Sequence, residues 1–134
     1  MSFVGASKVY ETAPVEVDGA QPYYLNCVVA LECGLSAVEL LRYCQGVEAA
    51  LGRERKGEKV PRTVDIDVLL FGDKVVGEPD YTLPHPGIGR AFNVVGLADL
   101  DPRLYVPGKG KIADVMAGIN FDGKSIVREV GALC

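Results

Sequence analysis

The chain has 134 residues, of which 49 % are hydrophobic and 24 % are charged, and its formal net charge is −4. This length and composition predict a single globular domain over residues 1–134 with a core of its own. No basic run offers a positive face to phosphate backbones, which argues against nucleic acid as a partner.

The sequence carries no sign of a membrane or secretory protein. No apolar run approaches the length that spans a bilayer, and Met1 opens no signal peptide, so we expect a cytoplasmic protein without a membrane partner. There is one histidine, and the cysteines include no Cys-x-x-Cys pair, which argues against a zinc site. We expect reduced, small hydrophobic residues at Cys27, Cys33, Cys44 and Cys134.

The first part of the chain predicts two strands. Residues 2–12 are rich in β-branched and aromatic residues and end at Ala13-Pro14, and residues 23–32 have the same character and follow Pro22. Both segments have the length and the boundaries of strands.

A helix is expected over residues 36–51. Ser36 and Glu39 have the spacing of a capping box, and Gly52 follows as a stop signal. Its apolar stripe is formed by residues at helical spacing, namely Leu40, Cys44, Val47 and Leu51, with Leu41 beside them.

The second part of the chain mixes both kinds of element. A charged loop over residues 53–59 leads into a predicted strand over residues 61–72, and residues 81–89 read as a loop rich in proline and glycine. The remaining elements expected are a helix over 90–100, a short helix over 111–119 and a strand over 125–130. Strands and helices in this order predict a mixed α/β (α+β) protein.

Two aspartates lie close together in the predicted strand over residues 61–72. Asp65 and Asp67 are two apart, so on a strand their carboxylates share a face and repel each other unless a cation binds. Mg²⁺ favours such hard oxygen ligands and usually completes its shell with waters and substrate phosphates. Arg62 lies nearby with a planar guanidinium suited to phosphate. An edge strand with solvated carboxylates is an equally open interpretation.

Other polar and aromatic groups extend this hypothesis. Cations of the charged loop could hold phosphate charge, and His85 sits in a loop stiffened by Pro84 and Pro86. Tyr24, Asn26 and Phe92 could stack on and read a flat heterocycle. Each has a plainer alternative: a solvated loop, a structural histidine, or aromatic core residues.

Several short motifs follow one another in a fixed order along nearly the whole chain. They are residues 7–15, residues 21–26, Glu48, residues 51–55, Pro61-Arg62-Thr63-Val64-Asp65-Ile66-Asp67 with the apolar run to Gly72, Leu83-Pro84-His85-Pro86, and Arg90-Ala91-Phe92. In this order they resemble the family of 6-hydroxymethyl-7,8-dihydropterin pyrophosphokinases. The resemblance implies a ferredoxin-like sheet with packed helices and transfer of pyrophosphate from ATP to a dihydropterin in folate biosynthesis, with release of AMP.

The resemblance also implies roles for individual residues. Two Mg²⁺ ions would lie on Asp65 and Asp67, and catalysis would involve these aspartates with Arg62, His85 and Arg90. The pterin would lie between Tyr24 and Phe92 and be read by Thr12 and Asn26. ATP would be bound by Gln45, Glu48, Arg53, Arg55, Arg62, His85 and Arg90.

The chain departs from the family pattern in several respects. The loop before Pro61 is short and carries Val60, and the loop between His85 and Arg90 looks one residue short. The chain starts near the family's second strand, so we expect an N-terminally short domain whose neighbouring strands close up, or a strand-sharing homo-oligomer in place of a monomer. Asp80 occupies the position of a family arginine. These departures leave open an alternative function, a weakened or non-catalytic relative that binds nucleotide or pterin without efficient turnover.

Overall fold

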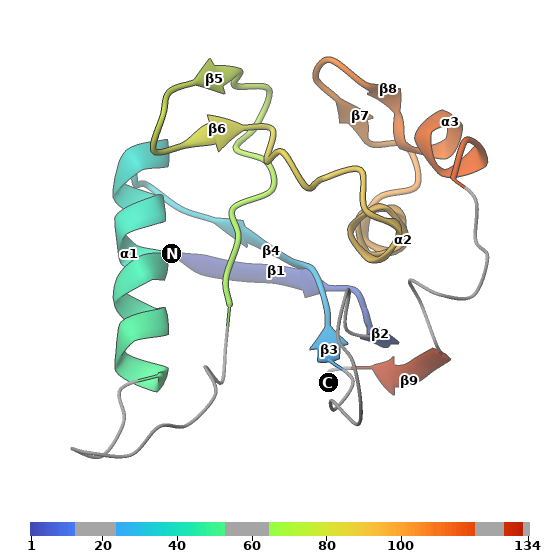
Figure 1. Ribbon diagram of the computed structural model, residues 1–134, viewed down its shortest axis with the longest axis horizontal. Helices are drawn as coiled ribbons and strands as arrows, with labels where there is room; N and C mark the ends of the chain where they lie inside the picture. The colour runs from blue at the N-terminus through green and yellow to red at the C-terminus, as the bar shows by residue number, and fades with distance from the viewer. Residues whose placement is uncertain (13–23, 53–64, 120–127, 133–134) are drawn as a thin grey trace, which may run out of the picture. The chain divides into compact units, whose positions relative to one another are not determined.

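The computed structural model describes residues 1–12, 24–52, 65–119 and 128–132. The chain separates into two compact units (Figure 1). The first unit consists of Met1–Cys33 together with Gly87–Cys134, and the second consists of Gly34–Pro86. Helices and small antiparallel sheets make up both units, which is a mixed α+β architecture. A single domain over residues 1–134 stays a prediction.

The strands from the beginning of the first unit, together with β9 (Arg128–Ala132), form two small antiparallel sheets. In one, β1 (Ser2–Ala6) pairs with β4 (Val29–Glu32). In the other, β2 (Lys8–Thr12) lies between β3 (Tyr24–Asn26) and β9. The predicted strands over 2–12 and 23–32 are therefore each divided into two. Residues 125–127 of the predicted last strand lie outside the described residues.

The divisions of the two long strands lie opposite each other, at Ser7 and Val28. The backbone N–H of Ser7 donates to the carbonyl of Val28 at 2.7 Å. The hydroxyl of Ser7 accepts from the N–H of Val28 at 2.8 Å and donates to the carbonyl of Lys8 at 2.8 Å. Ser7 is only 2 % exposed. One buried serine thus satisfies the backbone where both strands leave their ladders.

The core of the first unit gathers around α2 (Ala91–Leu100). The hairpin of β7 (Tyr105–Val106) and β8 (Gly110–Lys111) follows α2 and leads into α3 (Ile112–Ala117). Among the described residues, the largest fully buried side chains belong to this unit: Ile88, Val94, Val106 and Ile112. The helices predicted over 90–100 and 111–119 are confirmed, since apolar periodicity and helix ends are local signals.

The contacts of α2 with the sheet include a hydrogen bond from the Lys8 backbone N–H of β2 to the Asp99 carboxylate at 3.3 Å. The Tyr10 hydroxyl of β2 donates to the Asp99 carboxylate of α2 at 2.5 Å. Gly96 approaches the sheet so closely that a Cβ there would lie 2.5 Å from the Val28 Cγ2 atom. The glycine is therefore required by close helix–strand packing.

The second unit is built on α1 (Ala37–Leu51), the predicted helix. Its capping box is confirmed: the Ser36 hydroxyl accepts from the N–H of Glu39 at 3.2 Å, and the Glu39 carboxylate accepts from the N–H of Ser36 at 2.9 Å. Leu40 of the predicted stripe is buried, but Leu51 is 56 % exposed, so the stripe does not reach the last turn.

Two predictions for the second unit are wrong. Residues 61–64 of the predicted strand over 61–72 lie outside the described residues, and residues 65–71 belong to no ladder and run as an extended segment (Figure 1). Strand propensity alone makes no strand without a neighbouring backbone to pair with. Residues 81–89 were expected to be loop throughout, but β6 (Thr82–Leu83) pairs with β5 (Val76–Gly77) in a short hairpin. The Leu83–Pro84 peptide bond that follows is cis.

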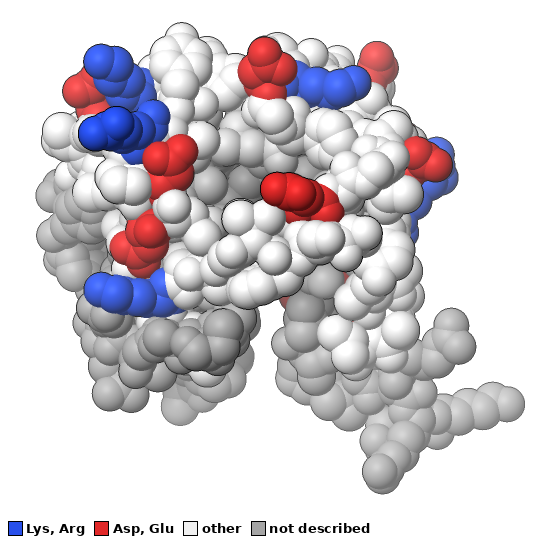
Figure 2. Space-filling model, turned by 180° about the vertical axis from the view of Figure 1, so that it is seen from behind, with Lys and Arg blue, Asp and Glu red and all other residues white. Residues whose placement is uncertain are grey.

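The described surface is mixed in charge. On the face shown in Figure 2, Lys and Arg side chains lie among Asp and Glu, and no basic patch gathers there. Among the residues that the structure describes, no helix has both the length and the apolar character needed to cross a bilayer.

Candidate active site

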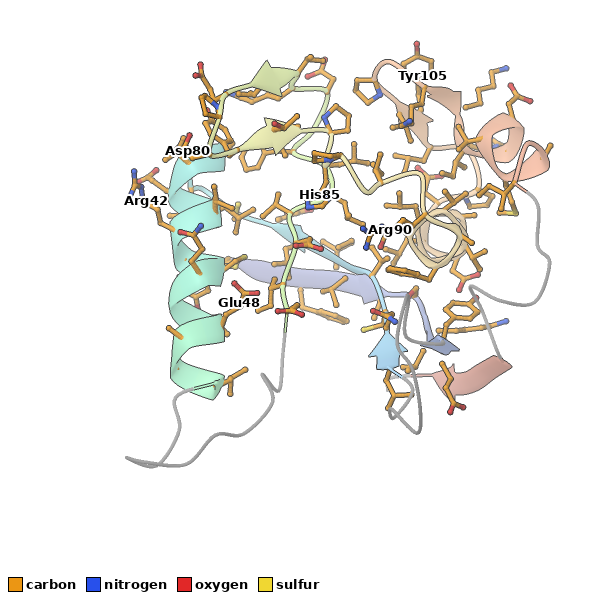
Figure 3. All side chains as sticks on the ribbon, viewed as in Figure 1. Arg42, Glu48, Asp80, His85, Arg90 and Tyr105 are labelled. Atoms are coloured by element: carbon orange, nitrogen blue, oxygen red, sulfur yellow. The ribbon has the colours of Figure 1, made fainter. Side chains whose placement is uncertain are left out.

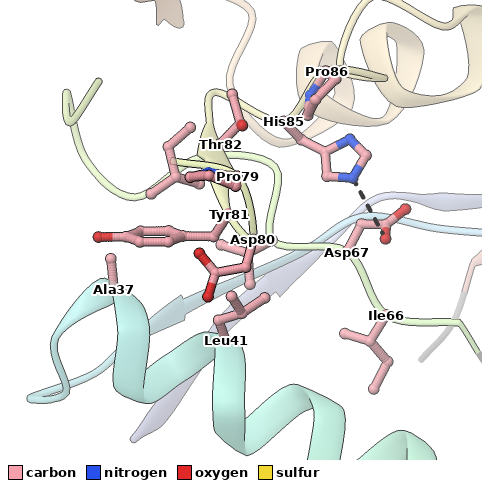
Figure 4. A pocket seen from close by; sticks show the side chains of 12 residues that line it. Ala37, Leu41, Ile66, Asp67, Pro79, Asp80, Tyr81, Thr82, His85 and Pro86 are labelled. Carbon is pink, nitrogen blue, oxygen red and sulfur yellow. Dashed lines mark ion pairs between the residues drawn. The ribbon is translucent and has the colours of Figure 1, made fainter. Parts of the chain in front are cut away.

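A cavity of about 240 Å³ lies within the second unit (Figure 4). Its walls come from one side of α1, from the extended segment after Asp65, and from the chain through β6. The lining residues are Ala37, Leu41, Ile66, Asp67, Val68, Pro79, Asp80, Tyr81, Thr82, Leu83, His85 and Pro86. Most of these side chains are apolar, and Asp67, Asp80 and His85 add polar groups that can orient a ligand.

His85 and Asp67 meet at one wall of this cavity. The Nε2 atom of His85 lies 3.6 Å from an Asp67 carboxylate oxygen, and the two side chains are 32 % and 58 % exposed. The backbone places them: the N–H of His85 donates to the carbonyl of Leu69 at 2.9 Å, which aligns the chain after β6 with the extended segment. The structure thus joins a predicted metal ligand and a predicted phosphate ligand.

Glu48 contacts the same segment from α1. Its Oε2 atom accepts a hydrogen bond from the backbone N–H of Ile66 at 2.6 Å. Ile66 is the residue between Asp65 and Asp67, so the peptide that links the two aspartates is held by the helix (Figure 3).

The remaining predicted ATP ligands divide into three cases. Gln45 lies on α1 with an exposed side chain. Arg90 belongs to the first unit, where it is the exposed N-cap residue of α2 and makes no side-chain capping hydrogen bond. Arg53, Arg55 and Arg62 lie outside the described residues. Convergence of the cations on a triphosphate therefore stays a prediction.

The predicted pterin residues all belong to the first unit. The antiparallel register of β2 and β3 pairs Thr12 with Tyr24 and Tyr10 with Asn26, which brings Thr12, Tyr24 and Asn26 into one short ladder. Phe92 is half-buried in the first turn of α2. The side chains of Thr12 and Tyr24 are outside the described part of the structure, so the facing of Tyr24 and Phe92 stays a prediction.

The cavity also contains residues to which the sequence assigned no role. Tyr81 presents its ring beside Ala37, and the Asp80 carboxylate lies between that ring and the Leu41 side chain (Figure 4). Asp80 stood out only as a departure from the family pattern. Proximity of both residues to the Leu-Pro-His-Pro motif was the one available signal.

The donor set near Asp65 and Asp67 fits magnesium better than metals that need a full protein shell. In the described ranges, no cluster of three or more His, Cys, Asp or Glu side chains forms a metal site. Mg²⁺ is commonly held by one or two carboxylates together with waters and substrate phosphates. Asp65 and Asp67 are both exposed, so they could supply such a partial shell.

Comparisons with known proteins show which family the chain belongs to. The model of the 7,8-dihydro-6-hydroxymethylpterin-pyrophosphokinase family matches residues 1–102. The 2-amino-4-hydroxy-6-hydroxymethyldihydropteridine pyrophosphokinases of Pseudomonas aeruginosa and Methylorubrum extorquens are 36 % and 39 % identical over 121 residues. These alignments cover 90 % of this chain and 74 % and 75 % of the two relatives. The folic acid synthesis protein fol1 of Schizosaccharomyces pombe is 38 % identical over 102 residues, 75 % of this chain and 14 % of that protein.

The matching family and the named relatives are ATP-dependent pyrophosphokinases, and this chain is an enzyme of that class. The chain is a member of the 7,8-dihydro-6-hydroxymethylpterin-pyrophosphokinase family. Its reaction is the transfer of pyrophosphate from ATP to 6-hydroxymethyl-7,8-dihydropterin in folate biosynthesis.

Proposed function

We propose that the cavity of the second unit receives the base of ATP, and that Asp67 and His85 at its wall meet the triphosphate. The observation that carries this assignment is the distance of 3.6 Å between His85 Nε2 and the Asp67 carboxylate, beside an apolar cavity. The pair unites a group suited to a cation with a group that can donate to a phosphate oxygen.

The size of the cavity supports a ring system as its occupant. Pockets for drug-sized ligands span roughly 300–1,000 Å³, and this cavity measures about 240 Å³. It could enclose one flat heterocycle but not a whole nucleotide. The ring of Tyr81 and the apolar side chains of Leu41 and Val68 offer surfaces on which a base could pack.

Asp65 and Asp67 would hold magnesium, and we propose two ions. When bound, magnesium supplies positive charge to the phosphate oxygens and favours the approach of a hydroxyl group. Asp65 and Asp67 would contribute carboxylate oxygens to the magnesium shell, and His85 would add a hydrogen-bond donor beside Asp67 at the wall of the cavity. Arg62 and Arg90 are the proposed partners of the remaining phosphate charge.

The reaction dictates which bonds change. The hydroxymethyl oxygen of the pterin forms a bond to the β-phosphorus of ATP, and the bond from that phosphorus to the oxygen bridging the α- and β-phosphates breaks. AMP leaves with the bridging oxygen, and the hydroxyl proton is released. Groups that hold the triphosphate in line with the hydroxyl provide most of the catalysis in such transfers.

The first unit would bind the pterin. Thr12, Tyr24 and Asn26 share one ladder, and an amide such as that of Asn26 can both donate to and accept from the edge of a pterin ring. Stacking on Tyr24 and Phe92 is part of the same proposal.

Two broader features belong to the proposal. A ferredoxin-like arrangement is supported by the antiparallel pairing of β2 with β3 and of β1 with β4, and by the contacts of α2 with the sheet. A cytoplasmic location is supported by the free thiols of Cys27, Cys33 and Cys44.

Release of AMP tests the function directly. We expect AMP to form from ATP only when both 6-hydroxymethyl-7,8-dihydropterin and Mg²⁺ are present. Calorimetric titration with a non-hydrolysable ATP analogue would report nucleotide binding separately. Binding of both ligands without AMP formation would instead identify the chain as a non-catalytic relative.

A further inference from the structure

The hydrogen bond from Ile66 to Glu48 joins two distant parts of the second unit. Glu48 lies near the end of α1, and Ile66 lies in the extended segment that carries the paired aspartates. The donor and acceptor are 2.6 Å apart and partly buried. Figure 3 shows Glu48 on the side of α1 that faces this segment.

This contact acts on the backbone of the segment that carries both aspartates. Among the described residues, 65–71 take part in no ladder. Hydrogen bonds of the segment's backbone include three contacts: the N–H of Ile66 donates to Glu48, the carbonyl of Leu69 accepts from the N–H of His85, and the carbonyl of Phe71 accepts from the N–H of Lys74. The first fixes the peptide between Asp65 and Asp67, and the second fixes the backbone beside His85.

The Ile66 N–H needs an acceptor oxygen at this reach, which a carboxylate or an amide side chain of this length can supply. Two neighbouring carboxylates repel each other, so a free segment would turn Asp65 and Asp67 apart and would have to be reordered before they could share a cation. A segment held at Ile66 needs less reordering.

We propose that Glu48 is a positioning residue that holds the backbone between Asp65 and Asp67, acting through the Ile66 N–H and not as a ligand of ATP. The proposal rests on the proposed function, in which the two aspartates hold magnesium. It replaces the role of nucleotide ligand that the family resemblance implied for Glu48.

Two conservative substitutions separate the alternatives. Glu48→Gln keeps an acceptor oxygen at the same reach but removes the charge, whereas Glu48→Asp keeps the charge but shortens the reach. If Glu48 holds the backbone, Glu48→Gln behaves like the wild type and Glu48→Asp does not. If its charge acts on a ligand, the order is reversed.

The first measurement needs no ligand. Hydrogen–deuterium exchange at the Ile66 amide is followed in the ligand-free protein, and we expect exchange at least about ten-fold faster in Glu48→Asp than in Glu48→Gln, because only the former loses the acceptor.

The second measurement is the Mg²⁺ concentration that gives half-maximal AMP formation. Loss of a group that orients a metal ligand typically weakens metal binding by about 10–100-fold. We therefore expect the half-maximal Mg²⁺ concentration to rise by this factor in Glu48→Asp alone, with the KM for pterin unchanged.

Glu39→Gln is the matched control, because it removes one carboxylate from the same helix while keeping a side chain that can complete the capping box. It should leave Ile66 exchange and the Mg²⁺ requirement unchanged. Equal loss of Mg²⁺ affinity in Glu48→Gln and Glu48→Asp would overturn the proposal, as would unchanged Ile66 exchange in Glu48→Asp. If the wild type forms no AMP, the proposed function fails, while the exchange experiment still decides whether Glu48 holds the segment.

Discussion

At the scale of single residues, Asp67 and His85 form a pair that contributes little to the stability of the fold. Asp67 is 58 % exposed and the charged atoms are 3.6 Å apart. Ion pairs at such exposed positions usually contribute about 0–1 kcal/mol to stability. Loss of this pair should therefore change stability little, which allows the proposed role in ligand binding to be tested separately.

Replacement of Asp67 by asparagine tests this separation of function from stability. Asp67→Asn keeps the shape of the side chain and removes its charge. We expect AMP formation to fall by at least about 100-fold, which corresponds to about 2.7 kcal/mol of lost transition-state stabilisation. The free energy of unfolding without Mg²⁺ should stay within about 0.5 kcal/mol of the wild type.

Asp73→Asn provides the control, because Asp73 is an exposed residue of the turn before β5. It should retain full activity. An Asp67→Asn protein that is much less stable yet keeps its Mg²⁺-dependent turnover would assign Asp67 a structural role.

At the scale of elements, the helices and the approximate places of the first strands followed from local sequence, whereas the division and the pairing of the strands did not. The capping residues Ser36 and Glu39 determine where α1 begins, and both are neighbours in sequence. The break of the long strands depends on Ser7 meeting Val28, which lies 21 positions away. The lack of a ladder over 65–71 and the place of Tyr81 in the cavity likewise depend on neighbours distant in sequence.

Two helical glycines give opposite predictions for the same substitution. In Gly96→Ala the new Cβ would lie 2.5 Å from Val28 Cγ2, and such overpacking typically costs about 1–3 kcal/mol. In Gly46→Ala on α1 the new Cβ meets nothing within 4 Å, so higher helix propensity should stabilise by about 0.5–1 kcal/mol. Urea unfolding of both variants measures the difference. A destabilised Gly46→Ala protein would contradict the open space beside Gly46, and a stabilised Gly96→Ala protein would contradict the close approach of Gly96 to Val28.

The capping box of α1 makes its stability depend on pH. The N–H of Ser36, and then its side chain, donate hydrogen bonds that hold the pKa of Glu39 below its ordinary value of 4.5. A lowered folded pKa means that this stabilisation is fully present above pH 4.5 and is lost as the pH falls through the folded value. In Glu39→Gln the group no longer titrates. The difference in free energy of unfolding between wild type and Glu39→Gln should therefore be larger at pH 7 than at pH 3, and equal differences would contradict this origin.

At the scale of the whole molecule, the two compact units carry residues predicted for different substrates. Thr12, Tyr24, Asn26 and Phe92, predicted for the pterin, belong to the first unit. The cavity and the carboxylates at positions 48, 65 and 67 belong to the second. Arg90 departs from this division, because it is predicted for ATP but lies in the first unit. The motif order predicted both sets, since each motif is short and local, whereas the walls of the cavity come from segments distant in sequence.

The division predicts that one chemical change affects different ligands in the two units. Phe92→Leu and Tyr81→Leu each replace an aromatic ring with an aliphatic side chain. Stacking is worth about 0.5–1.5 kcal/mol beyond the area that it buries, so each variant should lose about two- to ten-fold in affinity for its own ligand. Phe92→Leu should weaken the binding of 6-hydroxymethyl-7,8-dihydropterin more than the binding of a non-hydrolysable ATP analogue, and Tyr81→Leu should do the reverse.

Calorimetric titration of both variants with both ligands measures the four changes in affinity, and each variant is the control for the other. Equal weakening of both ligands in Phe92→Leu would make Phe92 a packing residue, and an unchanged nucleotide affinity in Tyr81→Leu would remove the base of ATP from the cavity.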